Sequence, residues 1–256
     1  MNDSTAKAAL DRAIGGDQKL LLVYQPIHDA RTKTIWAAEA LLRQRRENGE
    51  LRGASIITTA AEESAGPELF ALDTMLVERA YMDAAQWHKE RDVRLNVNLS
   101  PREFQEGNVL ERLTSLVTSC GIDTGKVNLE ITETSYIEEP EETMDVLLAL
   151  KKLGLALWLD DFGTGHSSLT HLQHFPLDGI KLPGSFVRPL PDDDRCAKIV
   201  RHLIALAHDL GLAVVAEEVE KQEQLDFLLD LECDYIQGFL LSKPMPKEEF
   251  QAWLKR

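Results

Sequence analysis

From residue 94 to the end of the chain, short apolar segments alternate with longer segments in which apolar residues recur with helical periodicity. Short apolar runs that end near glycine or proline are typical of strands. Strands that alternate with helices predict a sheet of mostly parallel strands with helices on its faces. We therefore expect strands at residues 94–101, 127–131, 155–160, 179–182, 213–216 and 235–237. The expected helices cover residues 4–13, 56–64, 70–90, 109–120, 140–153, 167–174, 222–231 and 247–255, and one more starts at the acidic residues 192–194.

Two further strands are expected at residues 20–27 and 34–42, ahead of the alternating part. The six residues between them are too few for a parallel crossover, so these strands should pair as an antiparallel hairpin. Together with the later segments they make eight strands, a number that favours a closed α/β barrel over an open sheet. In such barrels, the residues that carry the chemistry gather at the carboxyl ends of the parallel strands.

At 256 residues, the chain has the length of one large α/β barrel or of two small domains. No linker rich in proline, glycine or serine divides it, and no repeat of about 20–50 residues is evident. We therefore expect a single domain over residues 1–256, in which residues 1–18 form a helical lead-in to the first strand. A chain of this length can bury a substantial core.

The net charge of −15 narrows the classes of partner. Proteins that bind nucleic-acid polymers or anionic membranes without specificity present a basic face, so we expect neither of these partners. A small phosphorylated ligand is still compatible with this charge, because bound cations can reverse the local charge of an acidic pocket.

The three widely spaced cysteines fit neither a disulfide framework nor a zinc motif, and they are compatible with a reducing compartment. The N-terminus lacks the apolar core of a signal peptide, and no apolar run is long enough to cross a bilayer. We therefore expect a cytoplasmic domain without a membrane segment, which is either a whole protein or one module of a longer sensor protein.

The strand expected at residues 155–160 runs directly into two adjacent carboxylates, Asp160 and Asp161, and then into a glycine-rich turn. Neighbouring side chains in a strand point to opposite faces, so a site that uses both acids must lie where the chain leaves the sheet. On this segment alone, the alternative is a strand that stops at a polar turn, with Asp161 forming an Asx-turn to Gly163.

Polar residues also stand at or near the ends of the other expected strands, which favours a site at that end of the barrel. They are Glu39, Asn98, Glu130, Asp160, Asp161, Lys181, Glu217 and Gln237. A carboxylate inside an apolar strand, as at Glu39, costs several kcal/mol unless it is paired or binds a metal. Because Lys181 is the only cation in this set, five carboxylates need further positive charge, which oxygen ligation of Mg²⁺ or Mn²⁺ supplies. A metal trio of His166, His171 and His174 is the weaker alternative, since surface or packing roles explain these histidines.

Five short segments occur along the chain in an order and at a spacing that are typical of a known protein family. They are Glu39-Ala40-Leu41-Leu42-Arg43, Asn98-Leu99-Ser100, Leu129-Glu130-Ile131-Thr132-Glu133-Thr134, Asp160-Asp161-Phe162-Gly163-Thr164-Gly165 and Gln237-Gly238-Phe239. With these segments the chain resembles, over nearly its whole length, the EAL-domain family of cyclic di-GMP phosphodiesterases. The resemblance implies a modified TIM (β/α)₈ barrel whose first strand is antiparallel to the rest. It also implies Mg²⁺- or Mn²⁺-dependent hydrolysis of cyclic di-GMP to linear pGpG in bacterial second-messenger signalling.

The same resemblance implies roles for individual residues, with two metal ions in each site. The ligands of the first metal would be Glu39, Asn98, Glu130 and Asp160, and those of the second would be Asp160, Asp161 and Glu217. Lys181 would orient and help to deprotonate the attacking water, Glu217 would share that role, and Glu133 would hold the loop that closes over the metals and meets a partner subunit. Cyclic di-GMP would contact Gln25, Leu41, Arg43, Asn98, Asp160, Lys181 and Gln237. A homodimer is implied, as are sensory or GGDEF domains that are fused to the chain or separate from it.

The chain departs from the family pattern near the implied second metal. Pro183 stands where the family usually has the aspartate of a Lys-x-Asp-Arg segment, and Glu218 replaces a glycine next to Glu217. His166 stands where tyrosine is common. Family members that lose catalytic residues often bind cyclic di-GMP or a protein partner without cleavage. A receptor or protein-interaction module is therefore the alternative function, and a different Mg²⁺-dependent barrel enzyme is a more distant one.

Overall fold

The computed structural model describes residues 19–45, 51–53, 67–89, 91–99, 109–132, 140–164 and 172–255 of the chain. The helices expected at residues 4–13 and 56–64 lie outside these ranges, as do the lead-in over residues 1–18 and most of the helix expected at 167–174. No helix within the described ranges is both long and apolar enough to cross a bilayer.

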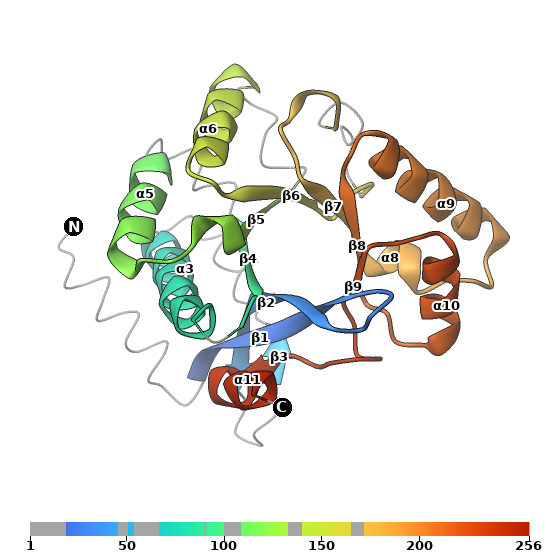
Figure 1. Ribbon diagram of the computed structural model, residues 1–256, viewed down its shortest axis with the longest axis horizontal. Coiled ribbons are helices and arrows are strands. Elements are labelled where there is room, and N and C mark those ends of the chain that lie inside the picture. Colours follow the sequence, from blue (N-terminus) through green and yellow to red (C-terminus); the bar gives the residue numbers. More distant parts are fainter. Residues whose placement is uncertain are drawn as a thin grey trace.

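Eight strands form a closed barrel, which Figure 1 shows nearly end-on. They are β1 (Lys19–Asp29), β2 (Ile35–Arg45), β4 (Arg94–Leu99), β5 (Val127–Thr132), β6 (Ala156–Asp160), β7 (Gly179–Leu182), β8 (Ala213–Ala216) and β9 (Tyr235–Ile236). Neighbouring strands are parallel except at β1, which is antiparallel to both β2 and β9. The expected α/β barrel and its antiparallel first strand are therefore confirmed.

Two short strands that were not predicted extend the sheet beyond the barrel. Strand β3 (Leu51–Gly53) pairs with the end of β2, and β10 (Met245–Pro246) pairs with β1. Segments of two or three residues are too short to show a periodicity of two, so their sequence does not distinguish them from loops. Their conformation depends on the edge of the strand that they meet.

Helices surround the barrel on its outside (Figure 1). The helical segments are α3 (Pro67–Trp87), α5 (Val109–Cys120), the 3₁₀ turn Thr124–Lys126, α6 (Pro140–Lys152), α8 (Gly184–Val187), α9 (Asp194–Asp209), α10 (Gln222–Asp230) and α11 (Lys247–Leu254). Helix α9 begins where expected because the carboxylate of Asp193 accepts the backbone N–H groups of Arg195 and Cys196 at 2.9 and 3.0 Å. After α6, Gly154 has a φ of 92°, a conformation that glycine adopts without strain.

Part of the barrel interior, on the amino-end side of Asp160 and Glu217, is apolar. A small buried cluster fills this part and is separate from the larger core between the strands and the helices. This apolar floor consists of Ile27, Ala37, Trp158 and Val215. Asp160 stands two residues after Trp158, and Glu217 stands two residues after Val215. Because side chains two positions apart point to the same side of a strand, the acids continue the interior directly above the apolar floor.

A buried polar contact joins α11 to the barrel. Asp83 on α3 is 3% exposed and accepts a hydrogen bond from the Tyr24 hydroxyl at 2.8 Å. Its other carboxylate oxygen lies 2.7 Å from Nζ of Lys247 on α11. The ring of Tyr24 also packs against Trp87 and Phe250, with centroids 4.8 and 5.8 Å away. These contacts hold β1, α3 and α11 together on the side of the barrel where its first strand lies.

Candidate active site

Lys181 is the centre of a charged cluster at the carboxyl ends of the barrel strands. It lies on β7 and its side chain is only 1% exposed. Its Nζ atom lies 2.7 Å from Glu217, 3.0 Å from Glu130, 3.3 Å from Asp160 and 3.6 Å from Glu39. These carboxylates come from β2, β5, the end of β6 and the residue after β8. Folding therefore gathers around one lysine the acids that are far apart in the sequence.

Glu39 is buried on β2, and both of its carboxylate oxygens accept hydrogen bonds. Asn98 Nδ2 donates to one oxygen at 3.0 Å, and Gln237 Nε2 donates to the other at 2.7 Å. Gln237 is itself buried, whereas Asn98 is exposed. The structure thus brings three predicted site residues from β2, β4 and the end of β9 into direct contact.

Two buried asparagines that were not predicted as site residues lie next to Glu130. Asn96 Nδ2 donates to Glu130 at 2.6 Å, and Asn128 Nδ2 donates to Asn96 at 2.7 Å. Asn96 lies two residues before Asn98, and Asn128 lies two residues before Glu130. A polar residue two positions before a site residue on a strand shares its face, so this spacing could have identified both asparagines.

The charges of the cluster shift one another's proton affinities. Burial would lower the pKa of Lys181, but the surrounding carboxylates raise it well above its usual value, so the ammonium stays charged. Burial and then the neighbouring charge of Glu39 raise the pKa of Glu130 well above that of an ordinary glutamate. Burial would also raise the pKa of Glu39, yet Lys181 and the bonds from Gln237 and Asn98 hold that pKa below its usual value.

The pKa of Glu217 is shifted toward neutral pH, which suits a group that takes part in proton transfer. Burial, with the charges of Asp160 and Glu39 added to it, raises the pKa of Glu217 to about 8, although Lys181 opposes the rise. In the protein alone, this carboxyl group therefore exchanges a proton close to physiological pH. It lies at the residue directly after β8, next to the open end of the barrel.

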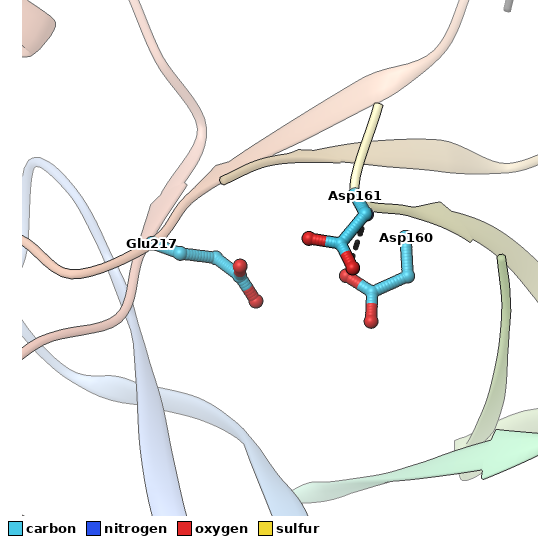
Figure 2. A group of neighbouring side chains, drawn as sticks. All are labelled: Asp160, Asp161 and Glu217. Carbon is cyan, nitrogen blue, oxygen red and sulfur yellow. Dashed lines mark hydrogen bonds between the residues drawn. The ribbon is translucent and has the colours of Figure 1, made fainter. Parts of the chain in front are cut away.

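Asp160, Asp161 and Glu217 form a group of oxygen donors within the cluster. Figure 2 shows Glu217 extending from one side of the barrel toward the two aspartates on the other side. One carboxylate oxygen from each of the three residues lies within 4.8 Å of the chosen oxygens of the other two. Asp161 has a φ of 54° and its backbone N–H donates to Asp160 at 3.0 Å, so the chain turns sharply where β6 ends. This turn places two consecutive acids at one site, although alternation along a strand would separate them.

The remaining predicted residues occupy different places. Gln25 is buried on β1, pairs in register with Glu39 and donates to the backbone oxygen of Ser242 at 3.4 Å. Leu41 and Arg43 follow Glu39 at alternate positions of β2, and both are half-buried. Glu133 lies outside the described residues, as do His166 and His171 of the histidine trio.

Comparison with known proteins settles the family of the chain. The family model described as EAL domain matches residues 7–244. The chain belongs to the EAL domain family. This EAL domain is 33% identical over 253 residues to the cyclic di-GMP phosphodiesterase PA2567 of Pseudomonas aeruginosa, and the match covers 98% of this chain and 43% of that protein. It is also 33% identical over 241 residues to the cyclic di-GMP phosphodiesterase NbdA of Pseudomonas aeruginosa, covering 93% of this chain and 30% of that protein.

The barrel of this EAL domain is also similar to solved structures. The structure described as PaMucR phosphodiesterase in complex with c-di-GMP matches it with a TM-score of 0.86 and 29% sequence identity. The match covers 96% of this chain and 99% of that one. By contrast, the chain spans less than half of the length of either curated relative, which is 43% for PA2567 and 30% for NbdA.

The two departures from the family pattern lie next to the charged cluster. Pro183 follows β7 and is the N-cap residue of α8, with a φ of −68° and no oxygen in its side chain to offer a metal. Glu218 forms an ion pair with Arg188 at the end of α8. Within the described residues, the ion pairs of Lys181 are those with the four carboxylates given above, and Glu218 is not among them.

Proposed function

We propose that this EAL domain is a phosphodiesterase that hydrolyses cyclic di-GMP to linear pGpG and depends on Mg²⁺ or Mn²⁺. The observation that carries the proposal is the acidic cluster around Lys181 at the carboxyl ends of the barrel strands. Two relatives named as cyclic di-GMP phosphodiesterases support it, as does a similar structure described as a complex with c-di-GMP.

The donor set of the cluster fits hard divalent cations. All its donors are carboxylate or amide groups, whose oxygens are the ligands that Mg²⁺ and Mn²⁺ prefer. Among the described residues, Lys181 is the only cation that pairs with the four carboxylates around it, so negative charge is left in excess. We assign one ion to Glu39, Asn98, Glu130 and Asp160, and a second ion to Asp160, Asp161 and Glu217.

Two divalent cations held by these residues would neutralise the charge that builds up on the phosphorus and on the leaving oxygen during in-line displacement. The side chains of this chain position the attacking water and take its proton. Lys181 Nζ, which is charged, orients the water by donating to its oxygen. Glu217, 2.7 Å from that Nζ atom, is the group that accepts the proton. Glu133 is proposed to hold the loop over the metals.

The phosphates and guanines of cyclic di-GMP are proposed to lie against residues on several strands. These residues are Gln25, Leu41, Arg43, Asn98, Asp160, Lys181 and Gln237. Arg43 suits a phosphate because a guanidinium donates two parallel hydrogen bonds to phosphate oxygens. In the protein alone, its Nη1 atom donates to the backbone oxygen of Leu42 at 2.9 Å, and burial lowers its pKa. Binding of a phosphate would therefore supply the charged partner that this half-buried cation needs.

Incubation of the pure protein with cyclic di-GMP and Mn²⁺, followed by chromatography for pGpG, tests the function. We expect pGpG to form, EDTA to abolish cleavage, and added Mn²⁺ to restore it. Ca²⁺ should substitute poorly, because it prefers longer bonds and more ligands. Cleavage that persists in EDTA would exclude the metal-dependent reaction.

Pro183 favours a second candidate function, that of a receptor which binds cyclic di-GMP or a protein partner without cleavage. Proline supplies no ligand where the family usually has an acid, and Glu218 is paired with Arg188 instead. The same incubation distinguishes the two functions. Cyclic di-GMP that is retained on the protein and recovered intact would indicate the receptor.

We also propose a setting for the domain, namely a cytoplasmic homodimer that acts with sensory or GGDEF domains, fused or separate. The additional domains are supported by the greater length of the curated relatives PA2567 and NbdA, of which the chain spans 43% and 30%. The homodimer and the cytoplasmic location rest on the family resemblance alone. Light scattering of the purified protein with and without cyclic di-GMP measures its oligomeric state. A single species with the mass of one chain under both conditions would exclude the homodimer.

A further inference from the structure

The backbone of Glu218 has a conformation that L-residues rarely adopt. Its φ is 54°, in the left-handed region where glycine is without strain. The residues on both sides are fixed by backbone hydrogen bonds, because Glu217 N–H donates to Leu182 and Val219 N–H donates to Gln237, each at 3.0 Å. Glu218 is therefore held in a strained conformation directly beside the proposed base of the reaction.

The side chain of Glu218 reaches across to α8. A Cβ atom at Gly184 would overlap the carboxylate of Glu218, so the space of a missing side chain at position 184 is filled by Glu218. The same carboxylate pairs with the guanidinium of Arg188, which follows α8. The segment after β8, which carries Glu217, is thereby tied to the segment after β7, the strand that carries Lys181.

We propose that Glu218 and Arg188 are positioning residues that fix Glu217 against Lys181, and that they compensate for the missing acid at Pro183. The inference rests on the proposed function and adds to it a device that is specific to this chain. Both departures from the family pattern then belong to one arrangement, because Gly184 leaves the space that Glu218 occupies.

Stability alone does not account for the arrangement. The side chains of Arg188 and Glu218 are 60% and 51% exposed, and ion pairs between exposed side chains contribute little to folding. The left-handed backbone of Glu218 opposes folding. Strained residues that persist in this way are typical of functional sites, where the surrounding structure holds a reacting group in place.

The test measures the affinity for Mn²⁺ by calorimetry in the whole chain, without cyclic di-GMP. The variants are Glu218→Gln, Arg188→Gln and the double variant, with Glu220→Gln as a matched control that removes an equal charge from an exposed residue of the same segment. We expect each single variant to weaken binding of the second Mn²⁺ by about 10-fold, the usual effect of losing a supporting residue around a metal. The double variant should be no weaker than either single variant, and the control should match the wild type. Effects that simply add, or a control with the same loss, would overturn the pairing.

Glu218→Gly separates positioning from stability, because the two properties should move in opposite directions. Glycine relieves the backbone strain, so we expect the urea midpoint of unfolding to stay or rise while the affinity for Mn²⁺ falls. Parallel losses of both would indicate a merely structural role and overturn the inference. A wild type that binds no Mn²⁺ would contradict the proposed function instead. The crystal structure of Glu218→Gly without metal then decides the inference: Glu217 should move away from Lys181, and an unchanged contact would overturn it.

Discussion

At the scale of single residues, the site depends on carboxylates in places where a charge is costly. Glu39 is 5% exposed, and its charge is kept by Lys181 and by two amide donors. Asn98 and Gln237 therefore stabilise the charged form of Glu39, which we propose to be a metal ligand. Glu39 has hydrogen-bond partners, but it is one of four acids around a single lysine, so negative charge is in excess there.

The first prediction concerns Glu39→Gln. The substitution keeps the volume and removes the charge, so the fold should stay intact while affinity for the first metal falls by at least about 10-fold. Calorimetry with Mn²⁺ measures the affinity, and circular dichroism checks the fold. Glu249→Gln, on the exposed surface of α11, is the control. An affinity equal to that of the wild type would contradict the assignment of Glu39 as a ligand.

The second prediction concerns Pro183→Asp, which restores a carboxylate after β7. The Mg²⁺ concentration that gives half-maximal cleavage should fall about 10-fold or more, or cleavage should appear if the natural protein has none. Pro183→Ala is the matched control, because it removes the proline without adding an acid. Mg²⁺ titrations of pGpG formation measure all three proteins. Identical curves for the aspartate variant and the wild type would show that this position has no influence on the second metal.

At the scale of elements, the sequence predicts the strands that have an apolar run followed by polar residues. It does not predict the short strands that form only because they pair with the edge of a longer one. The segment at residues 155–160 was recognised from its apolar run, whereas β3 and β10 exist because the ends of β2 and β1 offer them an edge. Helix α8 was not predicted either, since four residues after a proline show no periodicity. Sequence patterns do not predict the buried contact of Asp83 with Tyr24 and Lys247 either, because it joins residues up to 164 positions apart.

The third prediction tests that contact through Asp83→Ala. The change leaves the largely buried ammonium of Lys247 and the Tyr24 hydroxyl without their acceptor. The free energy of unfolding should therefore fall by about 2–4 kcal/mol. Lys198→Ala is the control, because it removes an exposed ion pair with Asp194 and should cost about 0.5 kcal/mol or less. Urea unfolding measures both. Equal losses in the two variants would contradict a special role for Asp83.

At the scale of the whole molecule, the closed barrel and its antiparallel first strand followed from the order of the elements and from the short link between the first two strands. The proximity of Glu39, Glu130 and Lys181 was predictable, because the carboxyl ends of parallel strands lie at the same end of a barrel. The supporting asparagines Asn96 and Asn128 could have been found from their spacing to Asn98 and Glu130, but the link between Glu218 and α8 could not. This link depends on which side chains meet between the segments after β7 and β8, and a single sequence does not contain that information.

The fourth prediction concerns stability and pH. Burial lowers the pKa of His28 to about 4, whereas in the unfolded chain it is about 6.5. Between these values the unfolded chain binds more protons, so the free energy of unfolding should fall as pH decreases from about 6.5 to about 4. His28 is 4% exposed, and its share of the loss is up to about 3 kcal/mol. Urea unfolding at pH 7 and pH 4.5 should show a smaller decrease for His28→Gln than for the wild type. The same decrease in both proteins would exclude His28 as a source.

The apolar floor of Ile27, Ala37, Trp158 and Val215 has a consequence for the order of events. Because this floor lies beneath the acids, the proposed ions and substrate would share one route, through the carboxyl end of the barrel. A substrate that occupies this route therefore stands between the bound ions and the solvent. The proposed ions would therefore exchange slowly while the substrate is bound, and a chelator would remove them only after the product has left. Metal binding should accordingly come first and metal loss last in each cycle.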